Sequence, residues 1–247
     1  MSTSYIYGLH AVKKMLQISI ENCESLHCLK NNNNRLQQVI SLAVQKKLSI
    51  KHVSRDQLSQ LVNTDKHQGC VLQISERNAP TISIEKLLQE VSSQSLFLIL
   101  DGVQDPHNLG ACLRTADAAG VSAVFIPKDR AAGISAIVRK VAAGAAETVP
   151  VITVTNINRT IKQLQQAGVW LYGASGEADS SLYDCNYQGA TALVMGAEGD
   201  GLRRLTAEAC DQLIKIPMLG QVESLNVSVA TGVCLYEIIR SRSTMEQ

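Results

Sequence analysis

The sequence lacks any apolar run long enough to cross a bilayer. A membrane-spanning helix needs about 20 consecutive apolar residues, and no stretch of this 247-residue chain provides them. Residues 1–10 show neither a basic leader nor an apolar signal core. We therefore expect a cytoplasmic protein that has no membrane partner.

Clustered cysteines are also absent. The seven cysteines are scattered, odd in number and never arranged as C-x-x-C, at positions Cys23, Cys28, Cys70, Cys112, Cys185, Cys210 and Cys234. This usage predicts free thiols in a reducing compartment. A zinc site needs grouped ligands, so we expect no metal.

Aromatic residues make up only 4% of the chain. RNA readers that stack bases on aromatic platforms are therefore disfavoured, and Tyr5 and Tyr7 are expected to pack the first strand. Two phosphate-binding motifs are missing as well. No G-x-x-x-x-G-K-[ST] occurs, and no G-x-G-x-x-G follows the first strand of the second half, so the sequence supports neither P-loop chemistry nor Rossmann-type dinucleotide binding.

The net charge of +1 conceals an asymmetry. Residues 1–75 hold nine Lys/Arg against four Asp/Glu, a balance of +5, whereas the remainder holds 14 against 18, a balance of −4. A basic module on a mildly acidic body suggests a polyanionic partner, with nucleic acid favoured. A solvated lysine-rich surface would give the same balance, so charge alone does not decide.

Hydrophobic patterning divides the chain into two α/β regions. Residues 1–75 alternate short helical and extended patterns, and residues 76–95, which contain Pro80 and four serines, are the expected linker. From residue 96 to 247 the alternation is regular. Strands are expected at 96–100, 123–127, 150–154, 169–174, 192–196 and 213–218, and helices at 109–119, 134–145, 156–167, 203–210 and 226–240. Near-continuous apolar strands separated by helices indicate a parallel sheet covered on both faces.

Polar residues follow three of these strands, where a parallel sheet builds its ligand crevice. Asn108, Ser224 and Asn226 each precede a helical run, so each is either a site residue or a helix cap worth about 1 kcal/mol. Glu198, among Gly196, Gly199 and Gly201, is either a ligand-facing carboxylate or an exposed turn acid. Arg114 lies in a helix of small residues. Its guanidinium suits the binding of a phosphate or carboxylate, and an exposed surface position is the alternative.

Three segments together resemble the motifs of the SpoU (TrmH) family of RNA ribose 2′-O-methyltransferases. They are DGVQDPHNLGACLRTADAAG (101–120), ALVMGAEGDGL (192–202) and IPMLGQVESLNVSVATG (216–232), in the family's order and spacing. The segments IYGLHAV (6–12) and HQGCV (67–71) resemble the ends of the family's substrate-binding domain. The likeness covers nearly the whole chain and is greatest to members that act on a guanosine ribose in large-subunit (23S) ribosomal RNA.

The resemblance implies an α/β fold whose C-terminal domain, 96–247, is a parallel sheet ending in a deep trefoil knot (SPOUT type). Knots are rare exceptions to fold rules, which pattern arguments do not reach. It further implies an L30e-like RNA-binding domain at 1–75, a homodimer, and S-adenosyl-L-methionine as cofactor. Cofactor contacts are carried over to Gly196, Ile216, Leu225, Ala174, Met218 and Ser224. The catalytic set is carried over to Asn108, Arg114, Glu198, Ser224 and Asn226.

Within that family Arg114 would be a candidate base, but its pKa argues against this role. The pKa of an arginine side chain lies far above neutrality, so deprotonation near neutral pH costs upwards of about 7 kcal/mol. We expect Arg114 to stay charged, grip RNA phosphate and stabilise the developing alkoxide, reaching across a dimer. The proton acceptor stays open between Glu198 and the substrate's phosphate. A transfer RNA ribose methyltransferase and a catalytically silent ribosome-assembly factor are the alternative functions.

Overall fold

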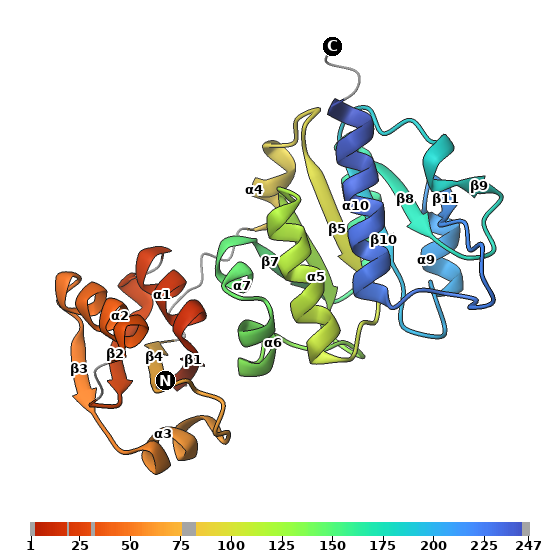
Figure 1. The fold of residues 1–247 in the computed structure, drawn as a ribbon. Coiled ribbons are helices and arrows are strands. Elements are labelled where there is room, and N and C mark those ends of the chain that lie inside the picture. Colours follow the sequence, from red (N-terminus) through yellow and green to blue (C-terminus); the bar gives the residue numbers. More distant parts are fainter. Residues whose placement is uncertain (1–2, 19, 31–32, 76–82, 244–247) are drawn as a thin grey trace. The chain divides into compact units, whose positions relative to one another are not determined.

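The computed structural model describes residues 3–18, 20–30, 33–75 and 83–243, and Figure 1 shows its fold. By its contacts the chain forms two compact units. The first combines Met1–Thr81 with Ile134–Thr148, and the second combines Ile82–Gly133 with Val149–Gln247. The short segment 134–148 therefore groups with the N-terminal unit, which the sequence did not indicate.

The N-terminal unit is built on a four-stranded sheet with the order β1-β4-β2-β3. Its strands are β1 (Thr3–Tyr7), β2 (Cys23–Cys28), β3 (Ser49–His52) and β4 (Cys70–Ser75). Only β2 and β3 run parallel, and β4 is antiparallel to both of its neighbours. After β1 come α1 (Leu9–Ile18) and a 3₁₀ turn, η1 (Ile20–Asn22).

Helices cover both faces of this sheet. On one face α1 and α2 (Asn34–Gln45) bury their apolar stripes against alternate strand residues such as Leu26 and Leu72. On the other, α3 (Arg55–Val62) packs Leu58 against Tyr7 and Val71. The expected packing of Tyr7 is confirmed, because its side chain is only 5% exposed.

The second unit contains a seven-stranded sheet with the order β7-β6-β5-β10-β8-β11-β9. Its strands are β5 (Leu96–Leu100), β6 (Ala123–Pro127), β7 (Val151–Val154), β8 (Trp170–Ala174), β9 (Ser180–Ser181), β10 (Thr191–Met195) and β11 (Gln212–Lys215). Every pairing is parallel, as expected. Strands β5, β6 and β10 are buried along their whole length, which is why their sequences are continuously apolar.

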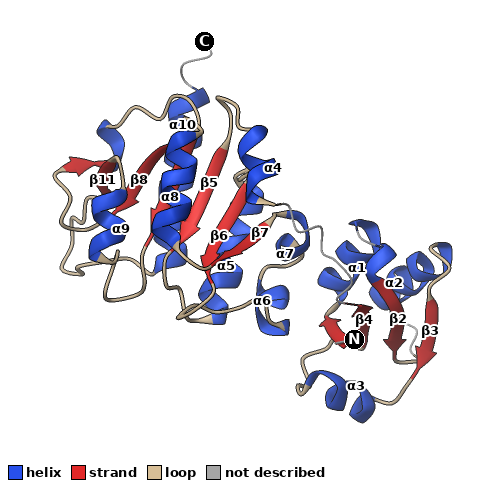
Figure 2. Ribbon diagram, turned by 180° about the vertical axis from the view of Figure 1, so that it is seen from behind, coloured by secondary structure: helices blue, strands red, loops and turns tan. Residues whose placement is uncertain are grey.

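Helices lie on both faces of the large sheet. In Figure 1, α5 (Pro106–Ala118) and α10 (Val227–Ser243) lie side by side across one face. Figure 2 shows α8 (Ile157–Gln166) and α9 (Arg204–Ala209) on the opposite face. There the core joins α8 to β5, β6 and β10. A 3₁₀ turn, η2 (Leu182–Asp184), follows β9.

No helix among the described residues is long and apolar enough to cross a membrane.

Two expectations differ from the structure. The expected helix at 134–145 is broken into α6 (Ala136–Val141) and α7 (Ala145–Thr148), because Ala143 and Gly144 adopt left-handed backbone angles (φ 53° and 97°). The expected linker at 76–95 falls partly outside the described residues. Its second half forms α4 (Ile84–Gln89), which buries Leu87 in the core of the large unit.

Free thiols are found at Cys28, Cys70, Cys112, Cys185, Cys210 and Cys234. Four of these, Cys28, Cys70, Cys112 and Cys234, are buried. Burial raises the pKa of Cys70 and of Cys234 to about 12. These thiols are therefore neutral and act as small apolar core residues.

The loop after β10 folds back onto its own strand. Ala197 and Gly201 exchange two backbone hydrogen bonds, of 3.0 and 3.1 Å. A Cβ atom at Gly196 would lie 2.1 Å from the carbonyl carbon of Gly201 and 2.4 Å from the amide nitrogen of Leu202. Glycine is required at 196 because the loop backbone occupies the space of a side chain.

One side chain ties the end of the C-terminal helix, α10, to the edge of the large sheet at which β5 and β10 begin. Arg242 donates hydrogen bonds to the carbonyl oxygens of Tyr187 (3.1 Å), Gly189 (2.7 Å), Gln94 (3.1 Å) and Ser95 (3.3 Å). These carbonyls belong to the segments that lead into β10 and β5. A planar guanidinium with five N–H groups can serve all four at once.

We predict that Gly196→Ala destabilises the second unit by about 1–3 kcal/mol, the usual cost of overpacking a close contact. The added methyl meets backbone, which has no rotamer change available to relieve the clash. Denaturant midpoints measured for both proteins test this. Gly133→Ala is the control, because a Cβ there meets nothing within 4 Å, and an equal shift in the two variants would contradict the close contact.

We predict that Arg242→Ala lowers the free energy of unfolding by about 2 kcal/mol, because four carbonyls lose a charged donor and solvent compensates in part. Urea denaturation checks the value. Arg204→Ala removes an exposed ion pair with Glu208 and should shift the midpoint far less. Equal effects would show that Arg242 acts only through its charge.

Candidate functional site

Three of the predicted site residues meet at one edge of the large sheet. Asn108 donates from Nδ2 to Oε1 of Glu198 at 2.5 Å, and Asn226 donates from Nδ2 to the same oxygen at 2.8 Å. Asn226 Nδ2 also lies 3.1 Å from Oδ1 of Asn108, to which it donates. We call these three residues the amide–carboxylate triangle. Residues up to 118 positions apart in the chain form it.

Asn226 is both a helix cap and a member of the triangle. Its Oδ1 accepts hydrogen bonds from the Ser228 backbone N–H (2.9 Å) and hydroxyl (2.6 Å) at the start of α10, while its Nδ2 serves the triangle. The interpretation of Asn108 as a helix cap is wrong, because Asp105 caps α5. Its Oδ1 accepts a hydrogen bond of 2.9 Å from the His107 N–H. The Asn108 amide is thereby left for Glu198.

An ion pair between a buried carboxylate and a half-exposed arginine supports the loop that carries Glu198. Asp101, directly after β5, is fully buried; it lies 3.3 Å from the Arg203 guanidinium and accepts a 2.6 Å hydrogen bond from the Thr206 hydroxyl. Its own N–H donates to the Met195 carbonyl at 2.8 Å. Sequence reasoning missed this support, although an aspartate directly after the apolar run LFLIL was the available signal.

Arg114 and Ser224 lie outside the triangle. Arg114 is exposed on α5. Six residues along a helix turn it about 120° away from Asn108 and raise it about 9 Å. Ser224 is exposed in the loop before α10, and within residues 83–243 its side chain makes no hydrogen bond. The structure thus joins three of the five catalytic candidates within one chain.

The cofactor candidates follow three adjacent strands. Gly196 comes after β10, Ala174 ends β8, and Ile216 comes after β11, which ends early because Pro217 constrains the residue before it. The register pairs Val194 with Gly173 and Ala174 with Ile214, so these strand ends are level. Two strand spacings cover about 10 Å, which fits a nucleoside.

The remaining candidates, Met218, Ser224 and Leu225, lie in the loop between β11 and α10. Ile216, Met218 and Leu225 are each half-buried, so they keep surface for a ligand. Gly196 itself is buried. Its lack of a side chain is explained by the close packing of the Gly201 and Leu202 backbone.

The site can bind and orient polar groups. Both triangle bonds to the carboxylate end on Oε1, so Oε2 of the exposed Glu198 is available for a hydroxyl donor. Within the described part of the chain, no group of three or more His, Cys, Asp or Glu is placed to hold a metal ion.

Two protein-family models match the chain. The SpoU rRNA Methylase family model matches residues 95–236, and the model for RNA 2′-O ribose methyltransferase substrate binding matches residues 5–80. The first match includes the whole amide–carboxylate triangle. The second covers most of the four-stranded N-terminal unit.

Curated relatives match along nearly the full length. The 23S rRNA (guanosine-2′-O-)-methyltransferase RlmB of Yersinia pestis is 52% identical over 239 residues, covering 96% of this chain and 97% of its own. The RlmB of Pasteurella multocida is 51% identical over 240 residues, covering 96% and 98%.

Solved structures agree on the fold. An RNA 2′-O ribose methyltransferase is 27% identical with a TM-score of 0.81, covering 98% of this chain and 89% of its own. An AdoMet-bound rRNA methyltransferase from Sinorhizobium meliloti is 26% identical with a TM-score of 0.78, covering 96% and 87%. The A. aeolicus TrmH/SpoU tRNA-modifying enzyme, 30% identical with a TM-score of 0.57, covers only 66% of this chain and 86% of its own.

The family match extends over more than half of the chain and contains the three residues that the fold brings together. Relatives half identical over nearly the whole length support the same assignment. This chain belongs to the SpoU rRNA methylase family.

Proposed function

We propose that this protein transfers a methyl group from S-adenosyl-L-methionine to the ribose 2′-hydroxyl of a guanosine in 23S ribosomal RNA. The observation that carries the proposal is full-length similarity to two enzymes of that name, across both units. The tRNA-modifying relative aligns with only two thirds of the chain. The N-terminal unit thus favours the ribosomal substrate over transfer RNA.

The strand ends of β10, β8 and β11 suit the cofactor. Their level register offers peptide groups beside the half-buried side chains of Ile216, Met218 and Leu225, a mixture typical of nucleoside sites. Gly196, Ala174 and Ser224 complete the proposed binding set. When bound, S-adenosyl-L-methionine supplies the electrophilic methyl group.

The triangle would orient the ribose hydroxyl and help to remove its proton. Asn108 and Asn226 hold the Glu198 carboxylate in one position, which lowers the entropic cost of aligning an acceptor. Oε2 of Glu198 can then accept a hydroxyl proton, and the substrate's own phosphate is the competing acceptor. Exposed Ser224 is placed in the loop that would approach the reacting ribose.

Arg114 would act as a permanent cation. Its exposed position on α5, turned away from the triangle, is consistent with service to the site of a second subunit. We therefore propose a homodimer in which Arg114 grips RNA phosphate and stabilises the alkoxide. Val229 and Tyr236 on α10 are each 52% exposed. Exposed apolar side chains of this size favour burial of α10 against a second subunit.

We also propose the finer fold features and the location. The resemblance to the SpoU family is the ground for proposing a trefoil knot at α10. Arg242 ties the end of this helix to the carbonyls of Tyr187 and Gly189. The mixed sheet covered by α1, α2 and α3 supports an L30e-like RNA-binding domain. An enzyme of ribosomal RNA modification would act in the cytoplasm.

We predict that Arg114→Lys lowers kcat about 100-fold, because an ammonium cannot reproduce the fork-shaped donor set of a guanidinium. Binding of S-adenosyl-L-methionine, measured by calorimetry, should stay unchanged. Single-turnover methyl transfer provides the rate. Arg159→Lys, on α8 of the opposite face, is the control. Near-full turnover by Arg114→Lys would rule out a specific guanidinium role.

We predict transfer of tritiated methyl to large-subunit ribosomal RNA made without this modification, with the label in a 2′-O-methylguanosine after nuclease digestion. Transfer RNA is the parallel substrate. Label found only in transfer RNA would show that the protein is a methyltransferase whose substrate is transfer RNA. No label on either RNA, with no cofactor binding by calorimetry, would favour the silent assembly factor.

A further inference from the structure

A pocket of about 520 Å³ lies in the N-terminal unit. Half-buried Leu29 and buried Leu36 contribute apolar lining, and the loop 65–69 that leads into β4 lines the pocket beside them. Arg55, at the start of α3, also lines it. The volume falls within the roughly 300–1,000 Å³ of small-molecule sites, so it exceeds the needs of a lone phosphate.

The loop is held in one conformation by a buried histidine. His67 is 1% exposed, and its Nδ1 accepts a 3.1 Å hydrogen bond from the Gly69 N–H. Nδ1 therefore carries no proton, and the proton of the neutral ring lies on Nε2, 3.3 Å from the Ser59 hydroxyl oxygen. Burial and the charge of Arg55 lower the pKa of His67, which favours this neutral form.

The next two loop residues have left-handed backbone angles. Gln68 has φ 55° and Gly69 has φ 84°. The Gly69 carbonyl accepts a 3.0 Å hydrogen bond from the Leu29 N–H, and Gln68 Oε1 accepts one of 3.0 Å from the Leu9 N–H. The loop is thus tied to two other segments. Its shape exists before any ligand arrives, which reduces the ordering cost of binding.

The charge around the pocket is positive. Arg55 and Lys66 are both exposed, and neither forms an ion pair within the described residues. The nearby acid, Asp65, accepts a 2.6 Å hydrogen bond from the Ser59 hydroxyl. Arginine and lysine favour phosphate, and a guanidinium plane can also stack on a base. An apolar wall with cations at the rim matches a nucleotide.

We propose that this pocket receives one unpaired nucleotide of the RNA substrate, with its base against Leu29 and Leu36 and its phosphate at Arg55 and Lys66. The proposal rests on the proposed function and gives the N-terminal unit a defined RNA subsite. An extruded nucleotide offers both a flat apolar face and a phosphate, whereas paired RNA offers mainly its backbone.

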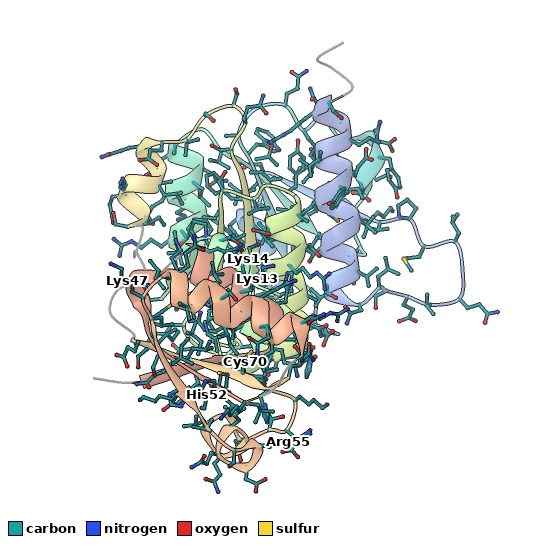
Figure 3. The ribbon with its side chains drawn as sticks, turned by 60° about the vertical axis from the view of Figure 1, so that its left-hand side comes forward. Lys13, Lys14, Lys47, His52, Arg55 and Cys70 are labelled. Atoms are coloured by element: carbon teal, nitrogen blue, oxygen red, sulfur yellow. The ribbon has the colours of Figure 1, made fainter. Side chains whose placement is uncertain are left out.

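Charge-matched double variants test the site in the full-length protein. Arg55→Ala/Lys66→Ala should raise KM for 23S ribosomal RNA at least tenfold and reduce the salt slope of binding by about 1–2. The kcat and the affinity for S-adenosyl-L-methionine should not change. The control is Lys46→Ala/Lys47→Ala, because Figure 3 places Lys47 far from Arg55 on the same unit. An equal rise in KM for both double variants would overturn the proposed nucleotide site.

Amide spectra of the full-length protein give an independent readout. Each of the four nucleoside 5′-monophosphates is added in turn, and at least one should shift the Gln68 and Gly69 signals in the wild type and not in Arg55→Ala/Lys66→Ala. Identical shifts with inorganic phosphate, or none with any nucleotide, would overturn the proposal. These spectra need no methyl transfer. Shifts in a protein inactive on ribosomal RNA would therefore refute the proposed function and leave the pocket standing.

Discussion

The Glu198 carboxylate joins segments that are remote in the chain. Its Oε1 accepts amide hydrogen bonds from Asn108, 90 residues away, and from Asn226, 28 residues away. These contacts form only because β5 and β10 are neighbours in the sheet and α5 packs beside α10. Carboxyl ends of parallel strands share one edge, so the site is a product of strand order.

The loop that carries Glu198 is rigid for two separate reasons. At its start, Gly196 admits the backbone of Gly201 into the space of a side chain. Near its end, Arg203 pairs with the fully buried Asp101. A buried carboxylate without a partner would be strongly destabilising, which makes this pairing a constraint on the loop as well as on β5. The position of the Glu198 carboxylate therefore depends on packing in the core.

The two units divide the work by charge and shape. The N-terminal residues carry the positive balance and a preformed pocket, which suits an anionic polymer. The second unit is mildly acidic and places its polar groups at one sheet edge. Under the proposed function, the first unit would bind RNA and the second would carry out methyl transfer. The segment 134–148 groups with the first unit although it comes from the second half of the chain.

The α/β class, the parallel sheet and most of its elements could be predicted from the sequence, because buried strands such as β5, β6 and β10 need continuous apolar runs. It also placed Asn108, Glu198 and Asn226 among the candidates. It could not separate capping from site roles, since a short polar side chain before a helix serves both. Only the tertiary structure assigned the cap of α5 to Asp105 and gave Asn226 both roles. The break at Ala143 and Gly144, the support by Asp101 and the packing reason for Gly196 were likewise decided by contacts between distant segments, which local sequence patterns do not encode.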